Sequence, residues 1–181
     1  MNKVILIAMI LIFNTCLYAK ESQKSMYASI STSLLNFGGS HGESLKNRQD
    51  IDTSDAPFEL EIGVLQSWDK RLGIYYKVDS VEVASANNDY STFGLSGILG
   101  LSTQKNAKAL PFISYGVGYG YSDNSSDVSV IEMDISLGVN YSIEQFEISA
   151  SVYRRGVLFS DSLNNNLYAV NGINVGAIFK F

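Results

Sequence analysis

Hydrophobic and polar residues alternate along most of the chain with a period of two. The clearest run covers 131–141, where every second residue is apolar and the residues between are acidic, small or asparagine. Because successive side chains of a β-strand point to opposite faces, this period predicts strands. The eight predicted strands cover residues 27–37, 58–68, 72–79, 93–102, 113–121, 131–141, 146–153 and 173–181.

The strands and their connections match a membrane barrel. Each strand has roughly the 9 to 11 residues that a tilted strand needs to cross a bilayer. With the amino terminus in the periplasm, the inner connections are short, and the two longest, 38–57 and 156–166, are outside. This arrangement is typical of outer-membrane barrels. An open sheet edge in hydrocarbon would leave backbone groups unpaired, so the first strand must pair with the last.

Alternation of polar and apolar residues occurs in membrane barrels and in soluble ones, so it cannot distinguish them. The kinds of residue on the two faces can. The polar face is mostly Gly, Ser and Asn with charges, which suits a narrow interior, and the apolar face is broad. Aromatic residues end the apolar rows in two predicted girdles: Phe58, Phe93, Tyr119 and Tyr121 at the outer ends, and Trp68, Tyr141, Phe146, Phe179 and Phe181 at the inner ends. Tyr76 and Tyr115 fall nearer mid-span on the same face, where the girdles do not account for them.

The carboxy-terminal residues Asn174, Gly176, Phe179 and Phe181 resemble the signal by which outer-membrane β-barrels are recognised for assembly. The stretch 111–121 also resembles a strand common in small opacity-type and OmpA-like barrels of the porin-like family. The resemblance implies an all-β fold, an eight-stranded antiparallel transmembrane β-barrel of outer-membrane type. It also implies contact with the barrel-assembly machinery, and activities in that family range over adhesion, envelope integrity and narrow pores.

Charged residues of the polar face are predicted to pair in the lumen: Glu61, Lys77, Glu132, Asp134 and Arg155. By parity, Lys77 is expected opposite Glu61 or one diagonal away, and Arg155 opposite Asp134 or Glu132. A barrel of eight strands leaves little more room than its side chains fill. We therefore expect these ion pairs to help plug the lumen.

Arg154 has the parity of the apolar face. It is the ninth residue of its strand, which places it at the outer interface. An arginine there costs about 0 to 1 kcal/mol and can reach lipid phosphates.

Residues 1–19 have the features of a secretory signal peptide, with Lys3 near the start, a short apolar run and small or neutral residues before the expected cleavage site. The apolar run is too short to cross about 30 Å of hydrocarbon. Cleavage leaves one barrel domain over 20–181 without the sole cysteine, Cys16. The alternative is a lipoprotein lipidated at Cys16, but the residues before it match such sites poorly.

The net charge argues against one class of partner, nucleic acids. Without Lys3 the chain has 12 Lys and Arg residues against 18 Asp and Glu, a net charge of −6. Nucleic-acid binding calls for a basic face, so the composition does not support it.

A hydrolase is the catalytic alternative, because some barrels that this chain resembles modify lipid A with a His and a Ser close together on one strand and an acid nearby. Here the sole histidine, His41, has Ser40 beside it and Glu43 beyond, in a Gly-rich loop unsuited to a fixed hydrogen-bonded geometry. Several loop carboxylates could bind a divalent ion, although a solvated acidic loop is the simpler interpretation: Glu43, Asp50, Asp52 and Asp55. We predict no catalytic, cofactor or metal site.

The sequence therefore predicts an integral outer-membrane protein with a structural or surface-interaction role, carried by the loops over 38–57 and 156–166. Its expected surroundings are outer-membrane lipid and lipopolysaccharide, with an extracellular ligand at the loops, and the barrel is expected to be a monomer. Two alternatives stay open: a narrow pore for small solutes, and a soluble periplasmic carrier of the lipocalin type.

Overall fold

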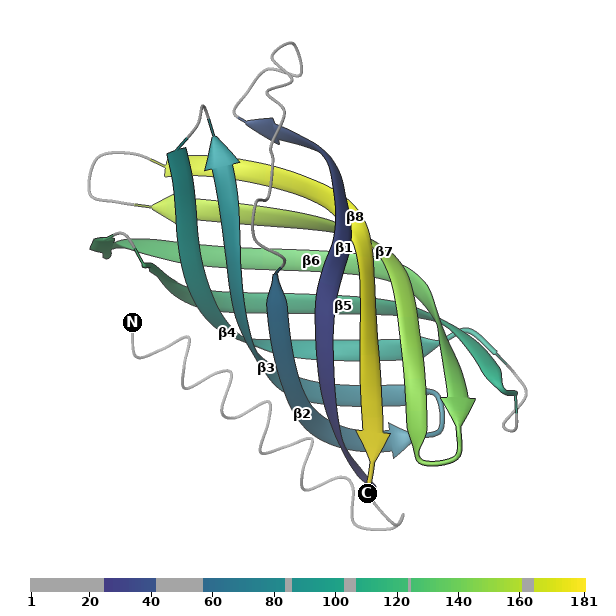
Figure 1. The fold of residues 1–181 in the computed structure, drawn as a ribbon. Coiled ribbons are helices and arrows are strands. Elements are labelled where there is room, and N and C mark those ends of the chain that lie inside the picture. The colour runs from purple at the N-terminus through teal and green to yellow at the C-terminus, as the bar shows by residue number, and fades with distance from the viewer. Residues whose placement is uncertain (1–24, 42–56, 84–85, 103–106, 124, 161–164) are drawn as a thin grey trace.

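Eight strands form one closed antiparallel barrel (Figure 1). The structure is a computed structural model and describes residues 25–41, 57–83, 86–102, 107–123, 125–160 and 165–181. The strands are β1 (Met26–His41), β2 (Phe58–Ser67), β3 (Lys70–Val83), β4 (Ala86–Gly100), β5 (Ala109–Ser122), β6 (Ser125–Ile143), β7 (Phe146–Ser160) and β8 (Asn165–Lys180). Each strand pairs with the next, and β8 pairs with β1, so the predicted closure is confirmed. In the residues described, no helix is long and apolar enough to cross a membrane.

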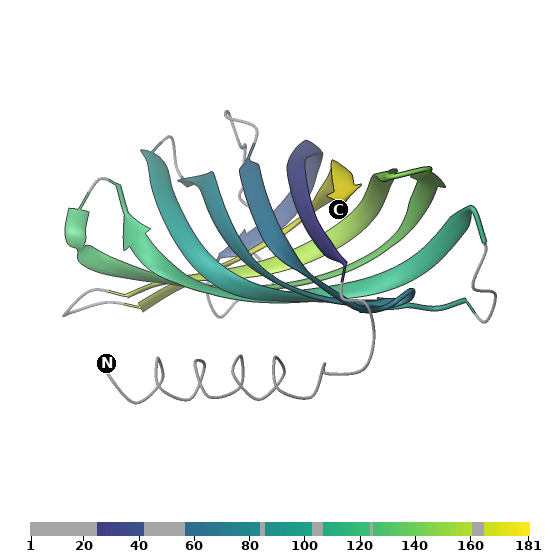
Figure 2. The ribbon, with the colours of Figure 1, turned by 90° about the horizontal axis from the view of Figure 1, so that it is seen from below.

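The two ends of the barrel differ in their connections, and we call them the turn end and the loop end. The turn end holds the connections after β2, β4 and β6, and the loop end holds those after β1, β3, β5 and β7. Met26 and Phe181 exchange backbone hydrogen bonds of 2.8 and 2.9 Å, so the barrel begins and finishes at the turn end. Viewed from below, the strands curve strongly around their common interior (Figure 2).

Strands extend further towards the loop end than the alternation predicted. The predicted loop over 156–166 is wrong for most of its length, because β7 continues to Ser160 and β8 begins at Asn165. β1 likewise continues to His41, inside the predicted loop over 38–57. The longest strand, β6, has 19 residues rather than about 11.

Two groups of predictions concern residues outside the described ranges. One is the signal peptide over 1–19, including Cys16. The other is the acidic segment that contains Glu43, Asp50, Asp52 and Asp55.

The predicted outer face of the barrel is the one that the structure exposes. On β6 the outward side chains of Met133, Ile135 and Leu137 are 61%, 56% and 54% exposed, whereas the inward Val130 and Glu132 are fully buried. The aromatic residues Phe58, Tyr119 and Tyr121 are exposed towards the loop end, and Tyr141, Phe146, Phe179 and Phe181 are exposed towards the turn end. Phe93, predicted at an outer end, is exposed at the middle of β4. Trp68, in the turn between β2 and β3, is half-buried.

The lumen near the loop end is apolar, which the sequence did not predict. Its buried side chains form one hydrophobic cluster, here the lumen cap: Val81, Tyr90, Val130, Tyr153, Val157, Phe159, Tyr168 and Val170. The ring of Phe159 meets those of Tyr90 and Tyr168 edge to face, at centroid distances of 5.5 and 5.6 Å. The small and polar interior predicted for the shorter strands therefore does not extend to the loop end, because the extended ends of β7 and β8 bring large apolar residues inside.

Candidate functional site

Below the lumen cap, on the side of the turn end, lies a group of buried charges that we call the central charge cluster: Glu59, Lys77, Asp79, Glu132 and Arg155. These residues come from β2, β3, β6 and β7, so the cluster connects opposite walls of the barrel. Alternation directs each side chain inward, because a strand sends every second residue to the same face.

Lys77 and Glu132 form the best-defined pair of the central charge cluster. The Lys77 Nζ lies 2.6 Å from Glu132 Oε1 and 3.1 Å from Glu59 Oε2. The hydroxyl of Tyr90 donates to Glu132 Oε2 at 3.0 Å, and the Lys77 ammonium lies 5.4 Å from the centroid of the Tyr75 ring. The carboxylate of Glu132 is therefore held by a cation and a hydroxyl although it has no exposed surface.

Arg155 completes the central charge cluster from β7. Its guanidinium pairs with Asp79, lies 3.8 Å from Glu132 Oε2 at Nε, and lies 4.8 Å from the centroid of the Tyr153 ring. The register places Arg155 opposite Asp134, as the parity argument anticipated. Of the two partners predicted for Arg155, Glu132 forms an ion pair with it, whereas Asp134 does not, because the guanidinium turns across the lumen towards Asp79.

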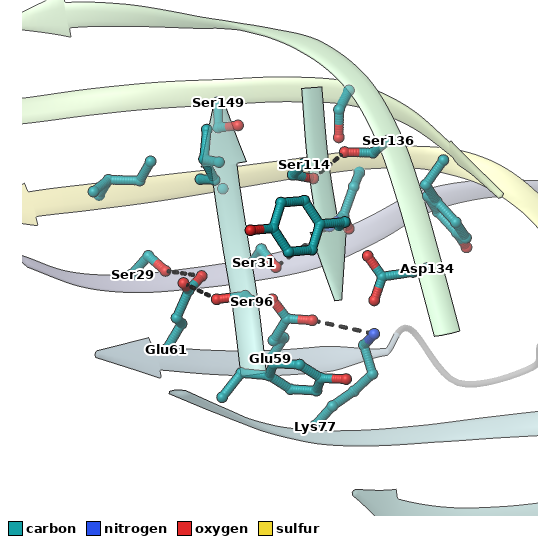
Figure 3. A pocket seen from close by; sticks show the side chains of 18 of the residues that line it. Ser29, Ser31, Glu59, Glu61, Lys77, Ser96, Ser114, Asp134, Ser136 and Ser149 are labelled. Atoms are coloured by element: carbon teal, nitrogen blue, oxygen red, sulfur yellow. Dashed lines mark hydrogen bonds and ion pairs between the residues drawn. The ribbon is translucent and has the colours of Figure 1, made fainter. Parts of the chain in front are cut away.

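A polar cavity of about 90 Å³ lies between the central charge cluster and the turn end (Figure 3). Its lining is rich in serine hydroxyls and also includes carboxylates: Ser29, Ser31, Ser96, Ser114, Ser136, Ser149, Ser151, Glu59, Glu61 and Asp134. Ser114 and Ser136 are 2.5 Å apart and hydrogen-bonded across β5 and β6. By size and polarity the cavity suits a few water molecules rather than an organic ligand.

Glu61 lies in this cavity and is bound by hydroxyl groups. Tyr27 donates to Glu61 Oε1 at 2.5 Å, Ser29 donates to Oε2 at 3.4 Å, and Ser96 also donates to Oε1. The predicted ion pair between Glu61 and Lys77 is wrong. The register aligns Lys77 with Glu59 and places Glu61 one diagonal away, so the ammonium reaches Glu59 and turns towards Glu132.

Glycines make room for the long side chains of the lumen. A Cβ at Gly73 would meet the carboxylate of Glu61, and one at Gly116 would lie 3.1 Å from Cγ of Asp134. A Cβ at Gly118 would lie 2.6 Å from the hydroxyl of Tyr75. The glycines that alternate on the polar face are therefore spaces into which charged and aromatic groups project.

A second ionic group closes the turn end, and we call it the turn-end cluster: Arg71, Glu147 and Lys180. Both cations pair with the Glu147 carboxylate, and Ser142 donates to its Oε1 at 3.0 Å. The Arg71 guanidinium also lies 5.8 Å from the centroid of the Tyr27 ring. This cluster ties β3 to β7 and β8 across the lumen.

The residues of the predicted assembly signal lie on both faces of β8. Asn174 donates from Nδ2 to Ser31 at 3.4 Å inside the barrel, and Gly176 pairs with Ser31 on β1. Outside, the ring of Phe179 lies 5.0 Å from that of Phe146 and 5.8 Å from that of Phe181. The outward pair therefore belongs to the aromatic surface at the turn end.

The residues considered for catalysis and metal binding lie only partly within the described ranges. There, no group of three or more His, Cys, Asp and Glu side chains is arranged to hold a metal ion. The backbone of His41 pairs with Tyr168, next to the paired Ser40 and Ala169, while Glu43 lies outside the described residues.

Parity reasoning missed most partners in these clusters. Asp79 shares a face with Lys77, and Glu147 is the polar neighbour of Phe146, so the signal for an inward direction was present. What the sequence lacked was a signal for pairing across the lumen, because Lys77 and Glu132 lie on strands that are three apart in the barrel.

Solved structures with the same fold are outer-membrane proteins. No protein-family model and no curated protein sequence matches the chain. Neisserial surface protein A (NspA) is 15% identical, with a TM-score of 0.58 over 88% of this chain and 98% of that one. The outer-membrane enzyme PagL is 15% identical, with a TM-score of 0.50 over 83% and 97%. The chain therefore has the closed eight-stranded antiparallel fold of small outer-membrane β-barrels.

Proposed function

We propose that this protein is an integral outer-membrane barrel with a structural or surface-interaction role and a lumen closed to solutes. The observation that carries the proposal is the inversion of its two faces. Residues such as Ile135, Val117 and Phe93 are exposed on the outside, while Lys77, Glu132 and Arg155 are buried inside. Hydrocarbon favours such a surface, and water does not.

Three layers support a closed lumen. The lumen cap fills the loop end with apolar side chains, the central charge cluster spans the middle, and the turn-end cluster joins β3, β7 and β8. A solute would have to break buried ion pairs, each of which leaves an unpaired charge when one partner is removed. In this proposal the protein acts through its outer surface and its loops and does not transport solutes.

Fractionation and electrophoresis test the membrane part of this proposal. The protein should pellet with outer membranes, and the unheated sample should migrate differently from the heated one on a denaturing gel, because intact barrels resist unfolding in detergent. Recovery in the periplasmic supernatant would instead support the soluble, lipocalin-like carrier.

Conductance tests the closed lumen. Purified barrels in a planar bilayer should show almost no current. The polar cavity of about 90 Å³ favours a narrow pore as the second candidate, and steady single-channel conductance would establish it in place of the closed barrel.

The surface role is assigned to the loop end. The segment between β1 and β2, over 42–57, is the longest connection in the chain, and it contains Glu43, Asp50, Asp52 and Asp55. Loops on a rigid scaffold are common sites of recognition. Replacing 44–54 with a short Gly-Ser linker should leave the heat-dependent gel shift intact and abolish any adhesion of expressing cells to a host surface.

PagL is an outer-membrane enzyme, so an enzymatic role is an alternative that must be tested for this chain. A hydrolase that uses histidine would need His41, because the chain has no other. We propose that the protein is not an enzyme. The lipid A of cells that overexpress it should have an unchanged acyl pattern by mass spectrometry, and a deacylated product that disappears with His41→Ala would contradict this.

A further inference from the structure

Arg154 is a cation on the outer, apolar face of the barrel. Among the described residues, the other Lys and Arg side chains lie in the lumen or at the turn end, whereas Arg154 is exposed on β7 between Ile135 of β6 and Asn171 of β8. An unpaired charge on such a face is costly unless it reaches a polar partner at the membrane surface.

Arg154 is the ninth of the 15 residues of β7, so it lies in the half of the strand nearer the loop end. It lies eight residues beyond Phe146, the exposed aromatic residue at the turn end of the same strand. At about 3.3 Å per residue and a tilt of about 40°, the two are roughly 20 Å apart along the barrel axis. The apolar band of such barrels is about 25 Å tall, so the guanidinium can reach the headgroup region when the side chain extends along the barrel surface towards the loop end.

Asn171 places an amide group beside Arg154. The two residues are direct partners between β7 and β8. On the other side of Asn171, the β1 ladder is interrupted, because Gly172 pairs with Asn36 while Val170 pairs with Gly39. Two residues of β1 therefore oppose one residue of β8, as in a β-bulge, and such irregularities often accompany binding sites.

The surface around Arg154 has the shape of an amphipathic site. On the side of the turn end, a groove of about 380 Å³ is lined by the apolar side chains of Ile135, Leu137 and Val152 together with Arg154 and Asn171. On the side of the loop end, the next outward residue of β7 is Gly156, where a Cβ would meet nothing nearer than 4.0 Å. A cation and an amide thus lie between an apolar groove and an open backbone surface.

We propose that Arg154 and Asn171 bind the phosphate group of a phosphorylated glycolipid of the lipid A type, with an acyl chain in the groove over Leu137 and Val152. The inference deepens the proposed function, since it rests on the outer-membrane location. The site lies towards the loop end, and therefore in the outer leaflet, where such glycolipids occur. The guanidinium supplies a planar pair of donors for phosphate oxygens, which an ammonium cannot match.

Native mass spectrometry of the refolded barrel in a phosphate-free detergent tests the site. The probes are bisphosphorylated lipid A, the same lipid without its phosphates, and phosphatidylglycerol. The wild-type protein should bind the phosphorylated lipid A more tightly than the dephosphorylated one by about tenfold or more, the effect of one charge-assisted hydrogen bond. Arg154→Leu should abolish that difference, and Arg154→Lys and Asn171→Ala should each reduce it.

Lys108→Leu is the matched control, because it removes one exposed cation at the turn end. It should bind lipid A like the wild type. Equal binding by Arg154→Leu and wild type, or equal loss in Lys108→Leu, would overturn the site, and equally tight binding of phosphatidylglycerol would overturn its assignment to lipid A. A heat-dependent gel shift verifies folding of each variant, with Arg154→Gln replacing Arg154→Leu if the latter does not fold. Failure of the membrane location would appear separately, as wild-type protein in the soluble fraction.

Discussion

The phenol ring of Tyr115 lies across the backbone of Gly97, its direct partner on β4. A Cβ at Gly97 would lie 2.8 Å from Cε1 of the ring and would also meet Cζ and the hydroxyl. Gly97 is buried as a result, although it has the outward parity. A tyrosine at mid-span thus covers a gap in the outer surface, which explains an aromatic residue that the girdles do not. Tyr76 is explained similarly, since its ring packs on Phe93 at a centroid distance of 4.7 Å.

This relationship predicts different tolerance at two glycines. In Gly97→Ala the Tyr115 ring can swing into lipid, so the free energy of unfolding should change by less than about 1 kcal/mol. In Gly120→Ala the new Cβ would lie 2.7 and 2.8 Å from backbone atoms of Ser91 and Thr92, which cannot move aside. The free energy of unfolding of Gly120→Ala should be lower than that of the wild type by about 1 to 3 kcal/mol, or the variant should fail to fold. Urea unfolding of barrels refolded into vesicles measures both, and equal stability of the two variants would contradict the assignment.

Removing Lys77 should be strongly destabilising. Lys77→Met leaves the fully buried Glu132 without its closest cation, and breaking one side of a buried pair costs about 3 to 5 kcal/mol. Lys77→Met/Glu132→Gln should recover part of the loss, because the unpaired charge is gone. Fluorescence of Trp68, the sole tryptophan, can follow unfolding in urea. A single variant as stable as the wild type would mean that Glu132 is not held by this ammonium.

A double-mutant cycle can distinguish the observed partner of Arg155 from the one that the register suggests. The guanidinium pairs with Asp79 across the lumen, while Asp134 is its neighbour on the adjacent strand. Arg155→Met combined with Asp79→Asn should show a coupling free energy within about 0.5 to 3 kcal/mol. Arg155→Met combined with Asp134→Asn should show a smaller one. The reverse order would support Asp134, one of the two partners that parity predicted for Arg155.

These clusters show how far local patterns reach. Alternation over 131–141 identified the outward residues of β6 because parity depends only on neighbours in the chain. The register of Asp134 with Arg155 was also accessible, since a two-residue connection joins β6 to β7. Pairing of Lys77 with Glu132 was not accessible, because it depends on strand tilt and on which side chains reach across the barrel.

The lumen cap was missed for a different reason. Val157 and Phe159 lie in a stretch with Gly156, Ser160 and several asparagines, whose composition favours a loop. The structure continues β7 through this stretch, and the two apolar side chains then point inward against Tyr168 and Val170. Backbone pairing with β8 decided the conformation, and pairing between strands cannot be read from the composition of one of them.

Lipid exposure of the outer face yields a test that needs no knowledge of the lumen. Val117 is 45% exposed, lies midway along β5 and has the outward parity, two residues from Tyr115 and Tyr119. An arginine at the bilayer midplane costs about 2 to 4 kcal/mol, against about 0 to 1 kcal/mol near the interface. Val117→Arg should therefore lower the free energy of unfolding in vesicles by the larger amount, and Ser129→Arg, near the loop end of β6, by the smaller. If the protein were soluble, the two substitutions would lower the free energy of unfolding by similar small amounts, because an exposed arginine would be in water at either position. If Val117→Arg folds and inserts as readily as Ser129→Arg, the exposed apolar rows do not face hydrocarbon.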